Sequence, residues 1–142
     1  MIKFVLGPSG SGKTKWLIDQ ANEEEKKGNK NIVFVDSDEK HIFTLDYNVR
    51  LINARDFFVD SLDAFVGFLG GILARDYDIG KIYVDGIYDI VDINKENILE
   101  LEKRLEELSE KCEAEFYIGL NWNKSDMPEE LNSDIYELKI EG

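Results

Sequence analysis

Eight consecutive residues near the amino terminus have the types and spacing needed to hold a chain of phosphates. They are Gly7, Pro8, Ser9, Gly10, Ser11, Gly12, Lys13 and Thr14, and they follow the pattern G-x-x-x-x-G-K-[ST]. Glycines allow backbone angles that other residues avoid, so successive N–H groups can turn inward around phosphate oxygens. Lys13 would bring positive charge to the outer phosphates, and Thr14 would offer a hydroxyl to Mg²⁺. The pattern predicts that these residues bind a nucleoside triphosphate.

A phosphate loop of this kind must lie between a strand and a helix. The residues before it, 2–6, form a short apolar run rich in β-branched and aromatic side chains, which predicts a strand. The residues from 13 to 27 contain neither Gly nor Pro, and Gly28 is a natural end for a helix. The helix would point its partly positive end at the phosphates.

A Mg²⁺-bound nucleotide also needs a carboxylate near its phosphates, at the end of an apolar strand. Asp85 follows the apolar residues 82–84 and is predicted to hold the water shell of the metal, with Thr14 as a direct ligand. Asp36 ends a similar run, 33–35, and is the alternative for this role.

Strand and helix patterns alternate along the rest of the chain. We expect strands over 2–6, 31–36, 81–85, 115–120 and 135–140, and helices over 13–27, 60–75 and 94–112, the second capped by Asp60 or Ser61 and the third by Asn94. A short strand over 49–52 is an open alternative, and 122–134 is expected to be a polar connector. The alternation predicts an α/β fold: a three-layer α/β/α sandwich with a mostly parallel five-stranded sheet, in one nucleotide-binding domain over 1–142.

The second expected helix, 61–75, is apolar nearly all round. Its glycines, Gly67, Gly70 and Gly71, weaken a helix unless something packs closely against them. One interpretation is a helix buried against the sheet; the other is a contact with a second copy of the chain or with a protein partner. The helix over 94–112 has a single apolar stripe, so its other face is expected to be solvated.

Composition narrows the classes of function. The formal net charge is -13, with 30 acidic and 17 basic residues, so bulk nucleic-acid binding is disfavoured. Cys112 is the only cysteine, which excludes an internal disulfide and a zinc cluster. No secretion signal precedes the first strand, and the longest apolar run, 64–74, is too short to span a bilayer, so we expect a cytoplasmic protein without a membrane span.

The glycine-rich loop, known as Walker A, and the strand that ends at Asp85 together resemble the P-loop NTPases, and in particular their RecA-like (ASCE-type) division. The resemblance implies ATP and Mg²⁺ as cofactors and a strand, ending in a polar residue, between the Walker A and Walker B strands. The strand over 116–120 would be that strand, with Asn121 as the sensor of the γ-phosphate. The implied sheet order is 5-1-4-3-2, counting the strands that begin near residues 2, 32, 82, 116 and 135.

One departure from the family pattern concerns hydrolysis. Many relatives carry a catalytic Glu directly after the Walker B Asp, whereas this chain has Gly86. RecA-type enzymes carry the base at the end of the second strand, which implies Asp36, or else Asp38, as the base, with Lys13 stabilising charge at the γ-phosphate. The resemblance thus implies an ATPase with weak or partner-dependent hydrolysis; the alternative is a nucleotide-sensing or assembly module without turnover.

Two other classes stay open. The loop is also similar to that of guanylate kinases, but a small nucleotide or nucleoside kinase needs several arginines at its phosphates, and the only ones are Arg50, Arg55, Arg75 and Arg104. The run Asn123-Lys124-Ser125-Asp126 matches the N-K-x-D motif of GTPases, although the D-x-x-G motif that should accompany it is missing. His41, the only histidine, is interpreted as a surface residue.

Overall fold

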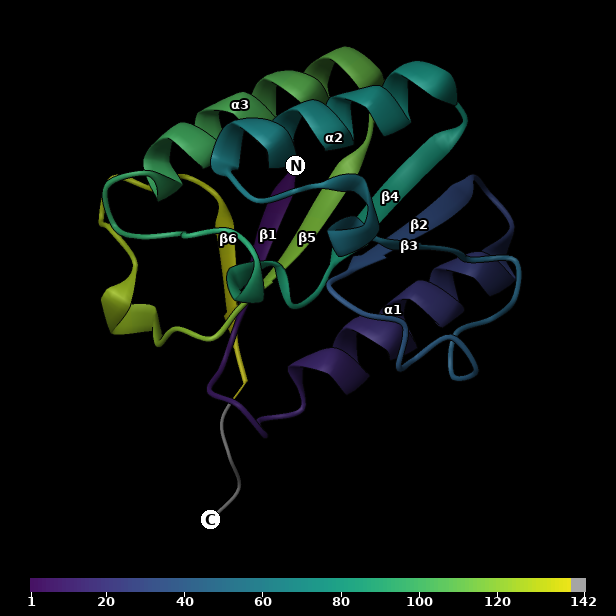
Figure 1. Ribbon diagram of the computed structural model, residues 1–142, viewed down its shortest axis with the longest axis horizontal. Coiled ribbons are helices and arrows are strands. Elements are labelled where there is room, and N and C mark those ends of the chain that lie inside the picture. Colours follow the sequence, from purple (N-terminus) through teal and green to yellow (C-terminus); the bar gives the residue numbers. More distant parts are fainter. Residues whose placement is uncertain (139–142) are drawn as a thin grey trace.

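A sheet of six strands forms the middle layer of the structure, a computed structural model that describes residues 1–138 (Figure 1). Its strands are β1 (Ile2–Leu6), β2 (Asn31–Asp36), β3 (Arg50–Asn53), β4 (Ile79–Val84), β5 (Glu115–Leu120) and β6 (Asp134–Glu137). The helices are α1 (Lys13–Lys27), α2 (Leu62–Arg75) and α3 (Ile98–Cys112), with short 3-10 turns at Ala54–Phe57, Ile87–Asp89 and Lys124–Asp126. The α/β class is therefore as expected.

The sheet differs from the prediction in strand count and in order. Its order is β3-β2-β4-β5-β1-β6, and every neighbouring pair is parallel. The prediction of five strands in the order 5-1-4-3-2 is wrong at one edge, because β3 pairs with Val33–Asp36 of β2 and adds a strand there. The apolar side chains of Leu51 and Ile52 pack against the cores on either side of the sheet, which accounts for this short strand.

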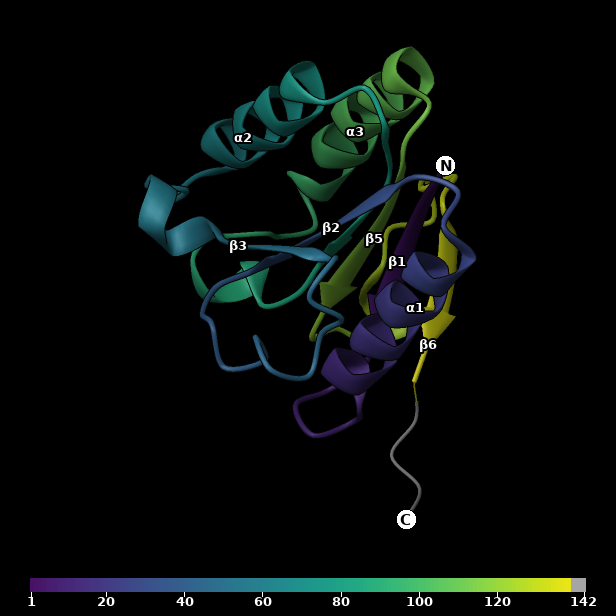
Figure 2. The same ribbon diagram turned by 90° about the vertical axis from the view of Figure 1, so that its right-hand side faces the viewer.

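Helices cover both faces of the sheet. Figures 1 and 2 show α2 and α3 side by side on one face and α1 alone on the other. The larger core lies between the sheet and α2 and α3, where Phe65, Leu69, Leu101 and Leu105 are buried. The smaller core lies under α1, where Leu17 is among the buried residues.

Three aromatic rings form a row under α1. Phe34, Tyr83 and Tyr117 occupy matching positions on the neighbouring strands β2, β4 and β5. The ring centroids of Phe34 and Tyr83 are 6.5 Å apart, and those of Tyr83 and Tyr117 are 4.7 Å apart, with nearly parallel planes in both pairs. These stacked rings give α1 a wide apolar surface to pack on.

Most predicted elements are confirmed, and the differences lie at their ends. Helix α2 starts after Ser61, whose side chain accepts a hydrogen bond from the N–H of Ala64. Helix α3 starts at Ile98 rather than after Asn94, because the Asn94 side chain accepts from the N–H groups of Glu96 and Asn97 and makes a separate turn. The last strand ends at Glu137, and residues 139–140 of its predicted span lie outside the described residues.

One residue of α3 contradicts the expectation of a solvated polar face. Glu102 is buried, and its Oε2 accepts hydrogen bonds from the N–H groups of Asn132 (3.0 Å) and Ser133 (2.9 Å). This carboxylate fastens the connector before β6 to α3. A charged side chain here serves as a buried acceptor for two backbone donors.

The glycines of α2 are not required by close packing. A Cβ atom at Gly67 or Gly71 would meet nothing within 4 Å, and one at Gly70 would meet only the Leu108 Cδ2 atom at 3.8 Å. The large side chains of Phe65, Leu69 and other residues of α2 are buried within the chain itself, as the first interpretation of this helix expects. Neither α2 nor any other helix in the described range has the combination of length and apolarity needed to cross a membrane.

Substitution Gly71→Ala should therefore stabilise the protein. Alanine removes backbone freedom from the unfolded chain at a helical position with open space, which is worth about 0.5–1 kcal/mol. We expect the thermal midpoint to rise by about 2 °C. As a contrast, Gly119→Ala should destabilise, since its Cβ would lie 3.1 Å from the Leu17 Cδ1 atom and 3.3 Å from the Val84 carbonyl oxygen. A lower midpoint for Gly71→Ala would mean that another surface covers this face of α2.

Candidate functional site

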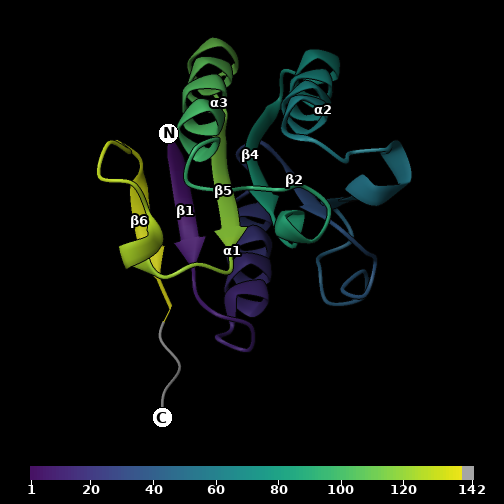
Figure 3. The ribbon, with the colours of Figure 1, turned by 60° about the vertical axis from the view of Figure 1, so that its left-hand side comes forward.

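The predicted phosphate loop connects the carboxyl end of β1 to α1 (Figure 3). Gly12 is the N-cap of α1, has a φ of 92°, and gives the helix no side-chain cap; Gly10 has a φ of 82°. The first N–H groups of an α-helix have no partner within the helix, so an uncapped start leaves donors and positive partial charge available to an anion. The two glycines provide the left-handed backbone that this turn requires.

The beginning of the loop is packed too tightly for a side chain. The N–H of Gly7 donates to the Leu120 carbonyl oxygen at 3.3 Å. A Cβ atom at Gly7 would overlap the Ser11 hydroxyl and lie 3.1 Å from the Leu138 carbonyl oxygen. The Ser11 hydroxyl oxygen is buried and has no hydrogen-bond partner. Gly7 and Ser11 therefore form the tightly packed inner side of the loop.

Lys13 lies across its own loop. Its Nζ atom donates to the carbonyl oxygens of Gly7 at 2.7 Å and Pro8 at 3.3 Å, and it lies 5.8 Å from the centre of the Tyr88 ring. Burial lowers the pKa of Lys13, and the negative charge of Asp85 partly opposes this shift. The ammonium group is thus held at the loop by neutral carbonyl oxygens, which a phosphate can replace.

Thr14 and Asp85, predicted to act together at the metal, are in direct contact. The Thr14 hydroxyl donates to Asp85 Oδ2 at 2.7 Å. Burial raises the pKa of Asp85, while the hydrogen bond from Thr14 and the charge of Lys13 act in the opposite direction. Gly119 of β5 lies next to this carboxylate, and a Cβ atom there would be in ordinary contact with Asp85 Oδ1, at 3.5 Å.

Asp36 is buried at the end of β2, and its Oδ1 accepts from the N–H of Ser37 at 2.7 Å. Burial, and next the negative charge of Asp85, raise the pKa of Asp36 to about 7. Two buried carboxylates therefore share one neighbourhood at the ends of adjacent strands. A carboxyl group whose pKa lies near neutrality is suited to accept a proton.

Gly86, which stands where many P-loop enzymes have Glu, has no room for a side chain. Its φ is 68°, and a Cβ atom would lie 2.6 Å from the Ser37 hydroxyl oxygen and 3.2 Å from Asp36 Oδ1. The end of β2 thus occupies the space that a longer residue would need. The packing of residues 36 and 37 against Gly86 therefore leaves no space for Glu at this position.

A cavity of about 630 Å³ lies over the phosphate loop. The residues that line it are Ser9, Gly10, Gly12, Lys13, Thr14, Lys15, Ile18, Asp19, His41, Thr44 and Tyr88. His41 is partly exposed, as its interpretation as a surface residue expects, and it also forms part of the wall of this cavity, which the sequence did not predict. Asn121 is exposed, follows Leu120 beside the loop, and is not among the residues that line the cavity.

The residues that the sequence did not reveal come from the segment between β2 and β3. Asn22 of α1 holds this segment, because its Nδ2 donates to the Thr44 carbonyl oxygen at 3.0 Å and its Oδ1 accepts from the N–H of Asp46 at 2.7 Å. Neither His41 nor Thr44 belongs to a motif. The hydrogen bonds with Asn22 and the burial of Leu45 hold them beside the cavity.

The run that matches N-K-x-D is engaged in a local turn. The N–H of Asn123 donates to Asp126 Oδ2 at 2.9 Å, and the N–H of Asp126 donates to the Asn123 carbonyl oxygen at 2.9 Å. The N–H of Lys124 donates to Glu137 Oε2 at 2.6 Å. These bonds use the Asp126 carboxylate to close a 3-10 turn, which accounts for the residue without a guanine ligand.

The donors at the site fit a cation that also takes phosphate oxygens. Within residues 1–138, no group of three or more His, Cys, Asp or Glu side chains is placed to hold a metal ion by itself. The Thr14 hydroxyl and the Asp85 carboxylate are oxygen donors, the type that Mg²⁺ prefers, and Mg²⁺ commonly uses one or two protein oxygens together with substrate phosphates and water.

No protein-family model matches the chain, and a search of curated proteins finds no significant match.

The raised pKa of Asp36 makes a prediction about stability. Between pH 4 and pH 7 the folded protein keeps a proton that the unfolded chain has released, so the free energy of unfolding should fall as pH rises through this window. Asp36→Asn removes this contribution. The variant should be more stable than the wild type at pH 8, by up to about 4 kcal/mol for a shift of this size, and no more stable at pH 4.

Urea unfolding without nucleotide, at pH 4, 6 and 8, measures this difference, and Asp38→Asn, two residues along and less buried, is the matched control. Parallel pH profiles for Asp36→Asn and wild type would show that the Asp36 carboxyl titrates normally.

Proposed function

We propose that the chain binds Mg²⁺–ATP as a P-loop NTPase of the RecA-like type and hydrolyses it weakly, or only with a partner. The observation that carries the proposal is the contact between Thr14 and Asp85 beside the buried Lys13. It joins the two halves of a nucleotide site that are separated by 71 positions in the sequence. A loop that merely turned the chain would need neither the buried ammonium group nor the buried carboxylate.

Each part of the loop has a role in this proposal. The free N–H groups at the start of α1 and the backbone around Gly10 and Gly12 would hold the phosphates. Lys13 would exchange its carbonyl partners for phosphate oxygens. Thr14 and Asp85 would hold Mg²⁺, directly and through its water shell, and the metal would neutralise charge on the outer phosphates.

The position of β5 supports the RecA-like division. β5 lies between β1, which leads into the loop, and β4, which is followed directly by Asp85. This is the arrangement that the resemblance implies, with one strand between the Walker A and Walker B strands. Asn121, the residue after β5, remains our proposal for the polar sensor.

Asp36 is our proposal for the base that activates water. Its pKa near 7 leaves a substantial ionised fraction at neutral pH, and it lies beside Asp85 at the same edge of the sheet. Asp is shorter than the usual Glu, and Gly86 offers no substitute, which is why we propose weak turnover. The crowding at Gly86 also favours a second candidate, a nucleotide-sensing or assembly module that binds without hydrolysis.

A kinase or a GTPase receives less support. Arg50 and Arg75 line a different cavity, at the other end of β2 and β4. The Arg55 Nε atom donates to the Ser37 carbonyl oxygen at 3.1 Å, and Arg104 pairs with Asp63 at 2.7 Å. None of these guanidinium groups lines the phosphate cavity, whereas a kinase needs several there.

A partner contact through α2 and a cytoplasmic location also remain proposals.

Lys13→Ala should abolish most of the nucleotide affinity. We expect Mg²⁺–ATP binding, measured by calorimetry, to weaken by about 100-fold, which corresponds to about 2.7 kcal/mol. Lys26→Ala, an exposed lysine at the far end of the same helix, is the matched control and should bind as the wild type does. Equal affinity in wild type and Lys13→Ala would remove the basis of the proposal.

Phosphate release separates the two candidate functions. A weak ATPase should release phosphate from Mg²⁺–ATP faster than Lys13→Ala does, and Asp85→Ala and Asp36→Asn should each lower the rate at least 10-fold, as expected for loss of metal positioning and of a base. Tight binding with release at the level of Lys13→Ala would instead favour the sensing module.

A further inference from the structure

We propose that the segment 41–46 forms a second wall of the nucleotide site, and that His41 in this wall contacts the terminal phosphate. The inference rests on the proposed nucleotide binding and goes beyond it. It assigns a ligand-binding role to a residue outside the glycine-rich loop, and it makes that residue the basis for preferring a triphosphate to a diphosphate.

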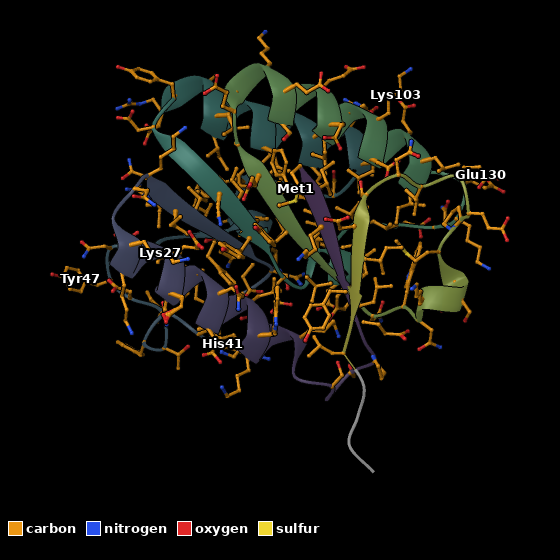
Figure 4. All side chains as sticks on the ribbon, turned by 180° about the vertical axis from the view of Figure 1, so that it is seen from behind. Met1, Lys27, His41, Tyr47, Lys103 and Glu130 are labelled. Carbon is orange, nitrogen blue, oxygen red and sulfur yellow. The ribbon has the colours of Figure 1, made fainter. Side chains whose placement is uncertain are left out.

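The cavity has two walls from distant parts of the chain. The phosphate loop and the first turns of α1 supply one, through residues such as Gly10, Lys13 and Ile18. His41 and Thr44 supply the other. Figure 4 shows the labelled His41 beside α1. A ligand held by the loop would therefore meet this second wall as it fills the cavity.

The second wall is anchored on two sides. Asn22 binds it through both atoms of its amide, as donor to Thr44 and acceptor from Asp46. Leu45 is buried in the smaller core under α1. Within the segment, the Thr44 hydroxyl donates to the His41 carbonyl oxygen at 2.9 Å, and the N–H groups of Thr44 and Leu45 donate to the same oxygen. The backbone of His41 is thus held in a hydrogen-bonded turn.

A polyphosphate in this cavity would need a further donor besides those of the loop. Two lysines line the cavity: Lys13 at the loop and Lys15, which forms an exposed pair with Asp19 at 2.6 Å on α1. The buried carboxylates of Asp36 and Asp85 lie close by and repel a polyphosphate. Among the residues that line the cavity, His41 is the remaining side chain with an N–H donor that can also carry positive charge.

The lining of the cavity also indicates which phosphate His41 would contact. His41 lines the same cavity as Lys13 and Thr14, and the Thr14 hydroxyl donates to Asp85. In the proposed complex, Thr14 and Asp85 hold the metal that neutralises the outer phosphates, and Lys13 binds phosphate oxygens. The contact of His41 is therefore assigned to the terminal phosphate and not to a phosphate nearer the nucleoside. Removal of that phosphate would leave the His41 contact unmade.

Affinity for two nucleotides tests this inference. The probes are Mg²⁺ complexes of the β,γ-imido analogue of ATP, which resists hydrolysis, and of ADP. His41→Ala should weaken binding of the ATP analogue about 10-fold and change ADP binding less than twofold. Asn22→Ala should reproduce this pattern, because it releases the wall that carries His41. The double variant should be no weaker than His41→Ala. Gln20→Ala, on the same helix but outside the cavity lining, is the control.

The single histidine supplies an independent readout. Its imidazole signal in the NMR spectrum needs no assignment and should move when the ATP analogue is added to wild type, with a smaller movement for ADP and for Asn22→Ala. Binding of the analogue with an unmoved imidazole signal, or equal affinity of His41→Ala and wild type for it, would overturn this inference and leave nucleotide binding standing. No binding of either nucleotide to wild type would overturn both.

Discussion

The hydrogen bond from Thr14 to Asp85 depends on how closely α1 approaches the sheet. Thr14 lies in α1, on one face of the sheet, and Asp85 follows β4, so the neighbouring strand β5 must not push α1 away from the sheet. Gly119 meets this requirement, since a Cβ atom there would crowd Leu17 of α1 and the backbone of β4. A missing side chain on a central strand, usually a weakness in a sheet, here allows the helix and the carboxylate to meet.

The same region concentrates charge in the interior. Lys13, Asp36 and Asp85 are all buried, and the pKa of each is shifted in the direction that disfavours its charged form. Burial of such groups costs stability unless each finds a partner. Here the lysine has two backbone carbonyls, Asp85 has the Thr14 hydroxyl and Asp36 has the N–H of Ser37, but the two carboxylates repel each other. A chain selected for stability alone would replace them. In the proposed nucleotide site, bound Mg²⁺ and phosphates would compensate these charges.

Elements with a strong local signal were predictable from the sequence with their exact bounds. β1, α1, β2 and β5 are uninterrupted runs with clear ends, such as Gly28 after α1. β3 was missed from the sheet because four residues, two of them polar, carry almost no pattern, and only pairing with β2 defines them. In the candidate site, the loop and Asp85 belong to motifs. His41 belongs to no motif. Its position depends on the hydrogen bonds that Asn22 makes to residues 44 and 46, and no pattern in the sequence predicts those bonds.

The uneven covering of the sheet has a further consequence. α1 is alone on its face, and its first turn belongs both to the phosphate loop and to the smaller core (Figure 2). Opening of that core would therefore disturb the loop as well. A bound anion would stabilise this half of the molecule. Amide hydrogens of α1 and β2 would then exchange more slowly with solvent, while those of α3 would keep their rates.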